Sequence, residues 1–211
     1  MTLDLEHHLT FTLVLVACLA PSPCATPLTP AQYGAYHHDS VNITIHMICV
    51  PLILVSAFTM ATYTGTLIQT PTWLTVPYLD LNLGTIAAFV YASLYLLLEP
   101  FAGFILAAFC MAGAAFGNYM RSQNPEPTFQ CALALHLVCW IMQFIGHGAF
   151  EGRAPALLDN LAQALFLAPM FVWLKMLFML GYRPELQARV EKKVQEEIAK
   201  FQAKSKNGKA Q

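Results

Sequence analysis

The sequence predicts an all-α fold: a transmembrane bundle of about five hydrophobic helices, two of them in a tight hairpin, followed by a polar C-terminal helix. Of its 211 residues, 57% are hydrophobic and only 11% are charged, whereas soluble domains carry about 25% charged residues. The apolar residues form long stretches, and backbone inside lipid must satisfy its hydrogen bonds within a helix. These features exclude an ordinary soluble globule and a disordered chain. The formal net charge of −1, with no basic stripe across the apolar part, argues against a nucleic-acid partner.

The chain divides into three parts by composition. Residues 1–32 form an atypical N-terminal segment, in which the apolar run 11–20 is shorter than the roughly 20 residues that a membrane span needs. That run is typical of a signal-peptide core, although acidic rather than basic residues precede it. Residues 33–184 are expected to form one membrane-embedded domain, and residues 185–211 a polar amphipathic tail.

Five apolar stretches are long enough, or nearly so, to cross a bilayer. They cover residues 43–64, 81–98, 101–119, 129–147 and 157–180. Asp39 or Ser40 can cap the first helix, and Glu99 with Pro100 turns the second and third into a tight hairpin. Loops are expected at 122–128 and 148–156, and Gly181 with Pro184 ends the fifth stretch.

The C-terminal segment 185–204 reads as a polar helix with a thin apolar stripe. Its spacing of three and four residues places the stripe on one face: Leu186, Val190, Val194, Ile198 and Phe201. We interpret it as a solvated helix on the protein or membrane surface, with a partner-binding coiled segment as the alternative. Eight of the 11 Lys and Arg residues lie between Arg183 and Lys209, which favours a cytosolic tail.

The order of the stretches predicts which histidines meet. A chain that crosses a membrane four times returns to its starting face, so the start of the first stretch and the end of the fourth should lie together. Two clusters therefore converge on one face: His37, His38 and His46 from the first, and His147 with Asp159 from the second. His46 lies about 9 Å beyond the cap, and its side chain points back toward the helix start.

Converging imidazoles are typical of a metal site, and they suit iron, zinc and copper alike. Haem ligation or a set of ordinary buried histidines are the alternatives. His147 lies between two glycines, Gly146 and Gly148, which allow a ligand to approach the backbone closely, and Gln143 lies one turn earlier. His136 precedes His147 by 11 residues, about 16 Å along a helix. It is therefore either part of a deeper substrate channel or a neutral core histidine bonded to a carbonyl.

A polar run follows His147 at the expected membrane boundary, where ionisable groups indicate function. It contains Glu151, Arg153, Asp159 and Asn160. Two structural alternatives stay open: Glu151 and Arg153 as an interfacial ion pair, and Asp159 with Gln163 as an interhelical clamp. Lys175 is expected to extend toward the membrane interface.

Two segments resemble the 2-hydroxy fatty acid dioxygenase family over roughly residues 33–190. They are YGAYHHDSVNITIHMICVPLILVS and the stretch beginning WIMQFIGHGAFEGRAPALLDN. The resemblance implies an Fe(2+)-dependent, multi-pass enzyme of the endoplasmic reticulum membrane. Its reaction would be α-oxidation of a 2-hydroxy fatty acid derived from phytosphingosine, in which dioxygen cleaves the C1–C2 bond and a fatty acid one carbon shorter remains.

The resemblance also implies roles for matching residues. His37, His38, His46 and His147 match the family's histidines and would hold the iron. Glu151, Arg153 and Asp159 match its second polar run as catalytic candidates: Arg153 would pair with the substrate carboxylate, and Asp159 would orient a ligating imidazole.

The sequence departs from the family pattern at two places. Residues 12–32 separate two segments that should be nearly adjacent, which we interpret as an insertion, such as a retained intron. Lys175 stands where an acidic residue is expected. A non-catalytic membrane lipid-binding or scaffold protein is the competing hypothesis. A two-iron desaturase would need H-x-x-H-H boxes, which the sequence lacks.

Overall fold

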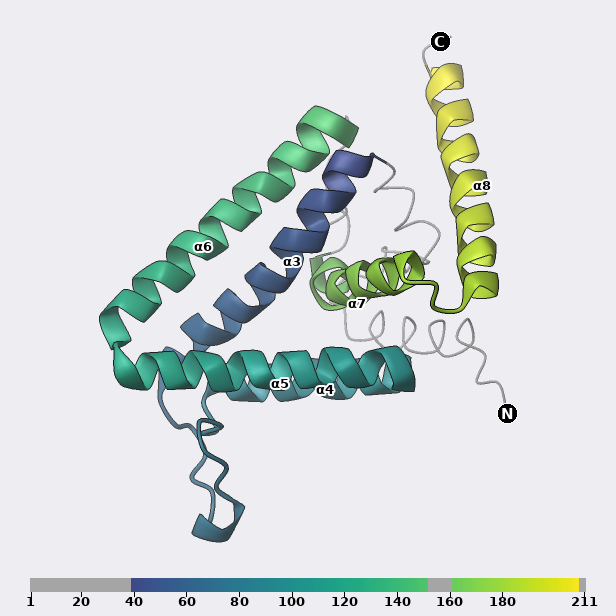
Figure 1. Cartoon of the computed structure of the whole chain (residues 1–211). Coiled ribbons are helices and arrows are strands. Elements are labelled where there is room, and N and C mark those ends of the chain that lie inside the picture. The colour runs from purple at the N-terminus through teal and green to yellow at the C-terminus, as the bar shows by residue number, and fades with distance from the viewer. Residues whose placement is uncertain (1–38, 152–160, 209–211) are drawn as a thin grey trace.

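The computed structural model describes residues 39–151 and 161–208, and helices make up every long element in these ranges (Figure 1). The α-helices are α3 (Ser40–Ala61), α4 (Leu83–Leu98), α5 (Pro100–Gln123), α6 (Pro125–Ile145), α7 (Leu161–Met179) and α8 (Pro184–Gly208). Two 3-10 turns, η1 (Thr62–Thr64) and η2 (Thr72–Leu74), and a π-helix, η3 (Gly146–Glu151), complete them. The predicted all-α class is thereby confirmed for the described residues. The atypical segment 1–32 lies outside them.

Three helical stretches are long and apolar enough to cross a membrane. They cover Ser40–Thr64, Pro100–Gln123 and Pro125–Glu151. Leu83–Leu98 and Leu165–Met179 are shorter apolar helices. The structure therefore supports a membrane protein, and all five predicted apolar stretches contain a helix.

The helix boundaries follow from caps and prolines. Asp39 caps α3, because its carboxylate accepts hydrogen bonds from the backbone N–H groups of Val41 and Asn42. The predicted loop 122–128 is wrong: Asn124 alone joins α5 to α6. A proline in the first turn of a helix loses no hydrogen bond, so Pro125 starts α6 at once. The predicted loop 148–156 is likewise helical up to Glu151.

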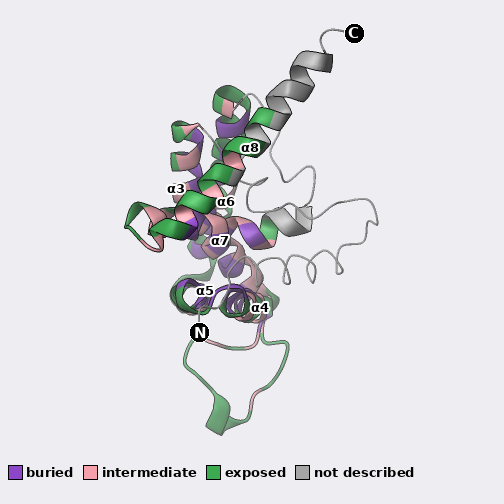
Figure 2. Ribbon diagram, turned by 90° about the vertical axis from the view of Figure 1, so that its right-hand side faces the viewer, coloured by how far each residue is buried: buried purple, intermediate pink, exposed green. Residues whose placement is uncertain are grey.

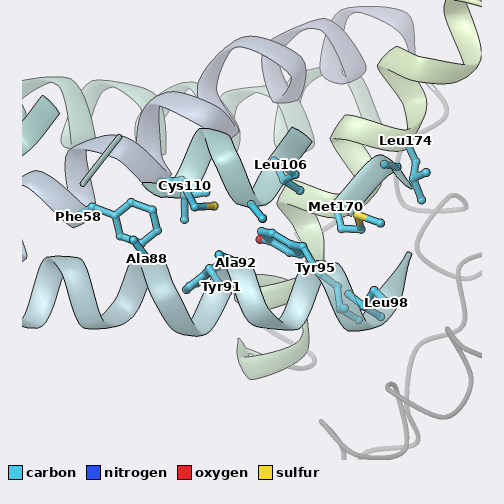
Figure 3. Packing of buried hydrophobic residues seen from close by; sticks show 14 of the residues in the cluster. Phe58, Ala88, Tyr91, Ala92, Tyr95, Leu98, Leu106, Cys110, Met170 and Leu174 are labelled. Carbon is cyan, nitrogen blue, oxygen red and sulfur yellow. The ribbon is translucent and has the colours of Figure 1, made fainter. Parts of the chain in front are cut away.

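The hydrophobic core lies between the α4–α5 hairpin and α7. The two hairpin helices run side by side in both views (Figures 1 and 2). Gly103 makes this close approach feasible, because a Cβ there would overlap the Tyr95 carbonyl. Tyr95 and Met170 are fully buried between these helices (Figure 3). The C-terminal segment predicted as a polar helix is helical as α8, and Leu186 in its first turn packs on the same cluster.

Helices α3 and α6 form a second, antiparallel pair, with the start of α3 beside the end of α6 (Figure 1). Contacts step along the pair in register: Asn42 with Glu151, His46 with His147, Cys49 beside Cys139, and Ser56 with His136. This register decides which polar residues of the two helices meet.

The other end of α3 meets the junction of α5 and α6. The Tyr63 hydroxyl donates to the Pro125 carbonyl, and the Arg121 guanidinium donates to the Thr62 carbonyl. The segment 65–82 projects beyond this end as a largely exposed loop (Figures 1 and 2). Trp73, in the 3-10 turn η2 of this segment, is 81% exposed.

Candidate functional site

The site consists of two buried imidazoles at one end of the α3–α6 pair. The rings of His46 and His147 pack edge to face with their centroids 4.9 Å apart. His46 is 6% exposed and His147 only 2%. Residues 101 positions apart in the chain thus meet as the order of the apolar stretches predicted.

A hydrogen bond shows that Nδ1 of His46 carries a proton. Its Nδ1 lies 2.9 Å from the Asn42 carbonyl, one turn earlier in α3. A carbonyl oxygen can only accept, so Nδ1 must carry the proton. The lone pair of the neutral ring is therefore on Nε2, the arrangement found in metal-binding histidines whose other nitrogen is anchored.

His147 belongs to the π-helix at the end of α6. Such wider turns are frequently found at functional sites. Gly146, the residue before His147, lies directly against the Asn42 side chain, and a Cβ added there would overlap Asn42 Oδ1. Only glycine allows this approach, so the glycine that the sequence places beside His147 serves contact between helices.

Glu151 joins the end of this π-helix to the start of α3. Its Oε1 accepts hydrogen bonds of 3.0 Å from the Asp39 backbone N–H and from Asn42 Nδ2. Glu151 therefore holds together the two chain segments that carry His46 and His147. Its expected ion-pair partner Arg153 lies outside the described residues.

Two further polar atoms are buried at the site. Asn42 Oδ1 and Gln143 Nε2 have no hydrogen-bond partner within the described parts of the chain. Asn42 was not among the predicted site residues, although its place four residues before His46 puts it on the same helix face. Gln143 was expected on the face of His147, and it is 6% exposed.

Of the four predicted metal ligands, the structure brings together His46 and His147. His37 and His38 lie outside the described residues, as do Arg153 and Asp159. Among the residues that are described, no group of three or more His, Cys, Asp or Glu side chains is placed to hold a metal ion.

His136 is separate from this site. Its Nδ1 lies 2.9 Å from the Ser56 hydroxyl, and its Nε2 accepts a 2.9 Å hydrogen bond from the Trp140 indole. Because Nε2 accepts, the ring is neutral. The prediction of a neutral, packed histidine is therefore supported over a substrate channel, and its partners include a hydroxyl and an indole.

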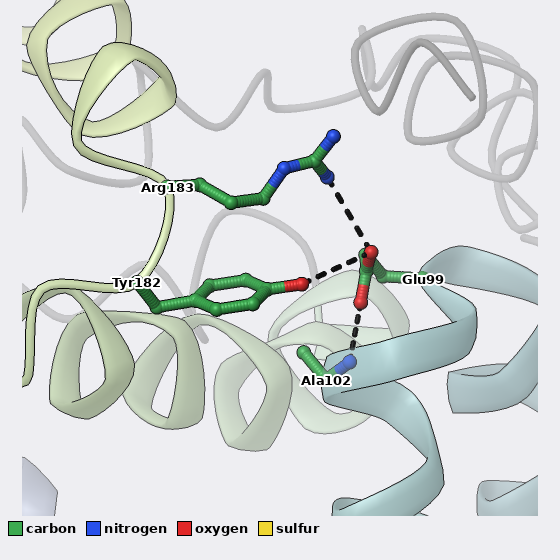
Figure 4. A network of polar contacts seen from close by, with 4 residues as sticks. All are labelled: Glu99, Ala102, Tyr182 and Arg183. Atoms are coloured by element: carbon green, nitrogen blue, oxygen red, sulfur yellow. Dashed lines mark hydrogen bonds and ion pairs between the residues drawn. The ribbon is translucent and has the colours of Figure 1, made fainter. Parts of the chain in front are cut away.

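A second polar cluster surrounds Glu99 at the α4–α5 junction (Figure 4). The Glu99 carboxylate accepts from the Ala102 backbone N–H and, at 3.4 Å each, from the Tyr182 hydroxyl and the Arg183 guanidinium. Burial raises the pKa of the Tyr182 phenol, and the Glu99 carboxylate raises it further, so the hydroxyl keeps its proton. This cluster attaches the start of α8 to the hairpin.

Comparison with known proteins decides the family. The model of the family described as "2-hydroxy-palmitic acid dioxygenase Mpo1-like" matches residues 29–180. The chain belongs to this Mpo1-like family. It is also 37% identical, over 159 residues, to the 2-hydroxy-palmitic acid dioxygenase MPO1 of Saccharomyces cerevisiae. The aligned residues cover 75% of this chain and 83% of the yeast protein. No solved structure matches.

Membership of the Mpo1-like family confirms the resemblance noted in the sequence and the enzyme class that it implied, a dioxygenase. The range that matches the Mpo1-like family includes both segments that form the histidine site.

Proposed function

We propose that the chain is an Fe(2+)-dependent dioxygenase that shortens 2-hydroxy fatty acids by one carbon. The observation on which this rests is the buried pair of His46 and His147, held in contact by helices from distant parts of the chain. The name of the yeast relative, a 2-hydroxy-palmitic acid dioxygenase, supports the substrate class.

The two imidazoles that the structure brings together are a ligand type that suits iron. When neutral, His46 has its lone pair on Nε2 because its Nδ1 donates to the Asn42 carbonyl, and the buried ring of His147 packs edge to face against it. In the proposal His37 and His38 complete the ligand set. Bound iron(II) would supply open coordination positions for the substrate oxygens and dioxygen, as in other non-haem iron oxygenases.

The proposed reaction balances with dioxygen alone. A 2-hydroxy acid and O2 give the acid one carbon shorter, carbon dioxide and water. The C1–C2 bond breaks, and C2 is oxidised to the new carboxyl carbon while dioxygen is reduced. In this scheme Arg153 pairs with the substrate carboxylate, Asp159 orients a ligating imidazole, and Glu151 keeps α3 and α6 together through Asp39 and Asn42.

A site at the end of membrane-spanning helices suits an amphipathic substrate. The carboxylate would stay at the boundary with water while the acyl chain lies among apolar helices, where burial is worth about 0.8 kcal/mol per methylene. We propose that the protein is a multi-pass protein of the endoplasmic reticulum membrane, and the three long apolar helices support this placement in a bilayer.

Purified protein tests this function directly. Protein prepared without oxygen should contain about one iron per chain and, given oxygen, convert 2-hydroxypalmitate to pentadecanoate with consumption of O2. His147→Ala should lose both the iron and the activity, because a ligand is removed. His136→Gln is the matched control, since His136 lies on the same helix outside the site, and it should keep the iron.

Wild-type protein that holds iron but does not convert the acid would contradict the enzymatic proposal and favour a lipid-binding role. A His147→Ala variant with normal iron content would remove His147 from the ligand set. Arg153→Ala should mainly raise the KM for the acid, since its carboxylate contact exists in both the ground and transition states.

A further inference from the structure

The site contains two buried polar atoms that its own described residues leave unsatisfied, and they are of opposite kinds. Asn42 Oδ1 can only accept a hydrogen bond, and Gln143 Nε2 can only donate one. Asn42 is fully buried and Gln143 is 6% exposed. Buried polar groups nearly always have a partner, and one without a partner is costly, so these two atoms point to a ligand.

The orientation of Asn42 is fixed by its surroundings. Its amide nitrogen donates to the Glu151 carboxylate at 3.0 Å. A carboxylate can only accept, so the nitrogen must face Glu151 and Oδ1 must face the other way. There Oδ1 lies close to Gly146, the neighbour of His147. The acceptor is therefore aimed at the turn that carries the second imidazole.

Gln143 approaches from the other helix. The antiparallel register pairs Cys49 with Cys139 and His46 with His147. Residue 143 lies between these two levels on α6, one turn before His147. Its backbone carbonyl accepts a hydrogen bond from the Gly146 N–H. The acceptor on α3 thus lies beside Gly146, the residue before His147, and buried Gln143 lies one turn before His147 on α6.

A donor and an acceptor beside a candidate metal site are complementary to a 2-hydroxy carboxylate. The acid group offers only acceptors at neutral pH, and the adjacent hydroxyl offers a donor. We propose that Gln143 and Asn42 recognise the substrate head group: the Gln143 amide donates to a carboxylate oxygen, and Asn42 Oδ1 accepts from the 2-hydroxyl. This inference rests on the proposed function and adds residues that bind its substrate.

The test measures binding of 2-hydroxypalmitate without oxygen, so that binding is separate from turnover. Gln143→Met keeps the length of the side chain and removes its amide. A hydrogen bond to a charged group is lost, so the affinity for 2-hydroxypalmitate should fall roughly ten- to a hundred-fold, with unchanged iron content. Gln130→Met makes the same change at an exposed position of α6, and it should bind like the wild type.

A negative charge introduced at position 143 separates substrate recognition by Gln143 from a merely structural role. Gln143→Glu replaces the donor with a carboxylate, which repels the acid but can accept from an amide. The wild type should prefer 2-hydroxypalmitate over 2-hydroxypalmitamide, and Gln143→Glu should reverse this preference. For Asn42, 2-fluoropalmitate offers no hydroxyl donor and should bind the wild type more weakly than 2-hydroxypalmitate.

The outcomes separate the two proposals. Equal affinity for 2-hydroxypalmitate in wild type and Gln143→Met overturns the recognition role of Gln143, even if the wild type is an active dioxygenase. If Gln143→Met does not fold, an unchanged preference of Gln143→Glu for 2-hydroxypalmitate over 2-hydroxypalmitamide overturns the recognition role of Gln143 instead. Binding that depends on Gln143, in a wild type that holds iron without converting the acid, contradicts the proposed reaction but supports the binding site.

Discussion

Gly146 and Gly148 flank His147, and their surroundings differ sharply. A Cβ at Gly146 would overlap Asn42 Oδ1, whereas nothing lies within 4 Å of one at Gly148. The Asn42 side chain is also held on its other side, because its Nδ2 donates a hydrogen bond to the Glu151 carboxylate. The side chain therefore cannot move aside without breaking the contact that holds α3 to the end of α6.

We expect Gly146→Ala to damage the site and Gly148→Ala to leave it intact. The added methyl at 146 should push α3 and η3 apart, at a cost of about 1–3 kcal/mol. The iron content of Gly146→Ala should fall with its melting temperature in detergent. Similar iron content and melting temperature in the two variants would contradict the contact between Gly146 and Asn42.

The sequence could predict part of this site. The order of apolar stretches was enough to bring His46 and His147 to one end of the bundle. The roles of Asn42 and Glu151 depend instead on the local register, and η3 shifts that register because a π-helix holds more residues per turn than an α-helix. No hydrophobic pattern marks such a turn, so the sequence placed residues 148–151 in a loop.

At the scale of helices, Glu99 is the main polar junction. It ends α4, caps α5 and binds Tyr182 and Arg183 at the start of α8 (Figure 4). The Glu99 side chain is 4% exposed, and that of Arg183 is 36% exposed. The carboxylate is thus the buried member, and its loss removes three contacts at once.

Glu99→Ala should destabilise the protein by about 2–4 kcal/mol, since it removes a helix cap and a buried partner of an ion pair. Tyr182→Phe removes one hydrogen bond and should cost about 1 kcal/mol. Both values can be read from denaturation in a mild detergent. Equal losses in the two variants would show that Glu99 acts through Tyr182 alone, contrary to the contacts with Ala102 and Arg183.

The helices were predictable from apolar runs, but their lengths were not. The expected loop 122–128 shrinks to Asn124 because Pro125 opens the next helix without losing a hydrogen bond. Helix α4 begins only after Asn82, whose side chain caps it and bonds to Asn118 of α5. Hydrogen bonds between helices thus decide where a helix begins, and the position of apolar runs in the sequence does not predict them.

On the scale of the whole molecule, the helix ends fall into two groups. Residues 62–64 and 121–125 meet at one end, where Arg121 and Tyr63 bind across the junction. The histidine site lies at the opposite end of α3 and α6. If α3, α5 and α6 each cross the membrane once, as their length allows, the start of α5 at Glu99 lies on the same face as the histidine site.

Helix α7 contacts only part of the α4–α5 hairpin. The Leu165 carbonyl accepts from Tyr91, halfway along α4, at 3.3 Å. Toward the end of α7, the Trp173 indole donates to Ala102 at the start of α5, at 2.9 Å. Arg183, just beyond α7, reaches Glu99. These contacts therefore lie on the half of the hairpin nearest Glu99.

This arrangement predicts that α8 and the histidine site share a membrane face and that the loop 65–82 lies on the other. The basic tail favours the cytosol, so the site should face the cytosol and Trp73 the lumen. In sealed microsomes, protease should remove an epitope tag at the C-terminus and spare one inserted beside Trp73, with detergent making both accessible. A full crossing by α7 would instead place both tags on one side, and equal digestion of the two would contradict the packing of α7 on a single half of the hairpin.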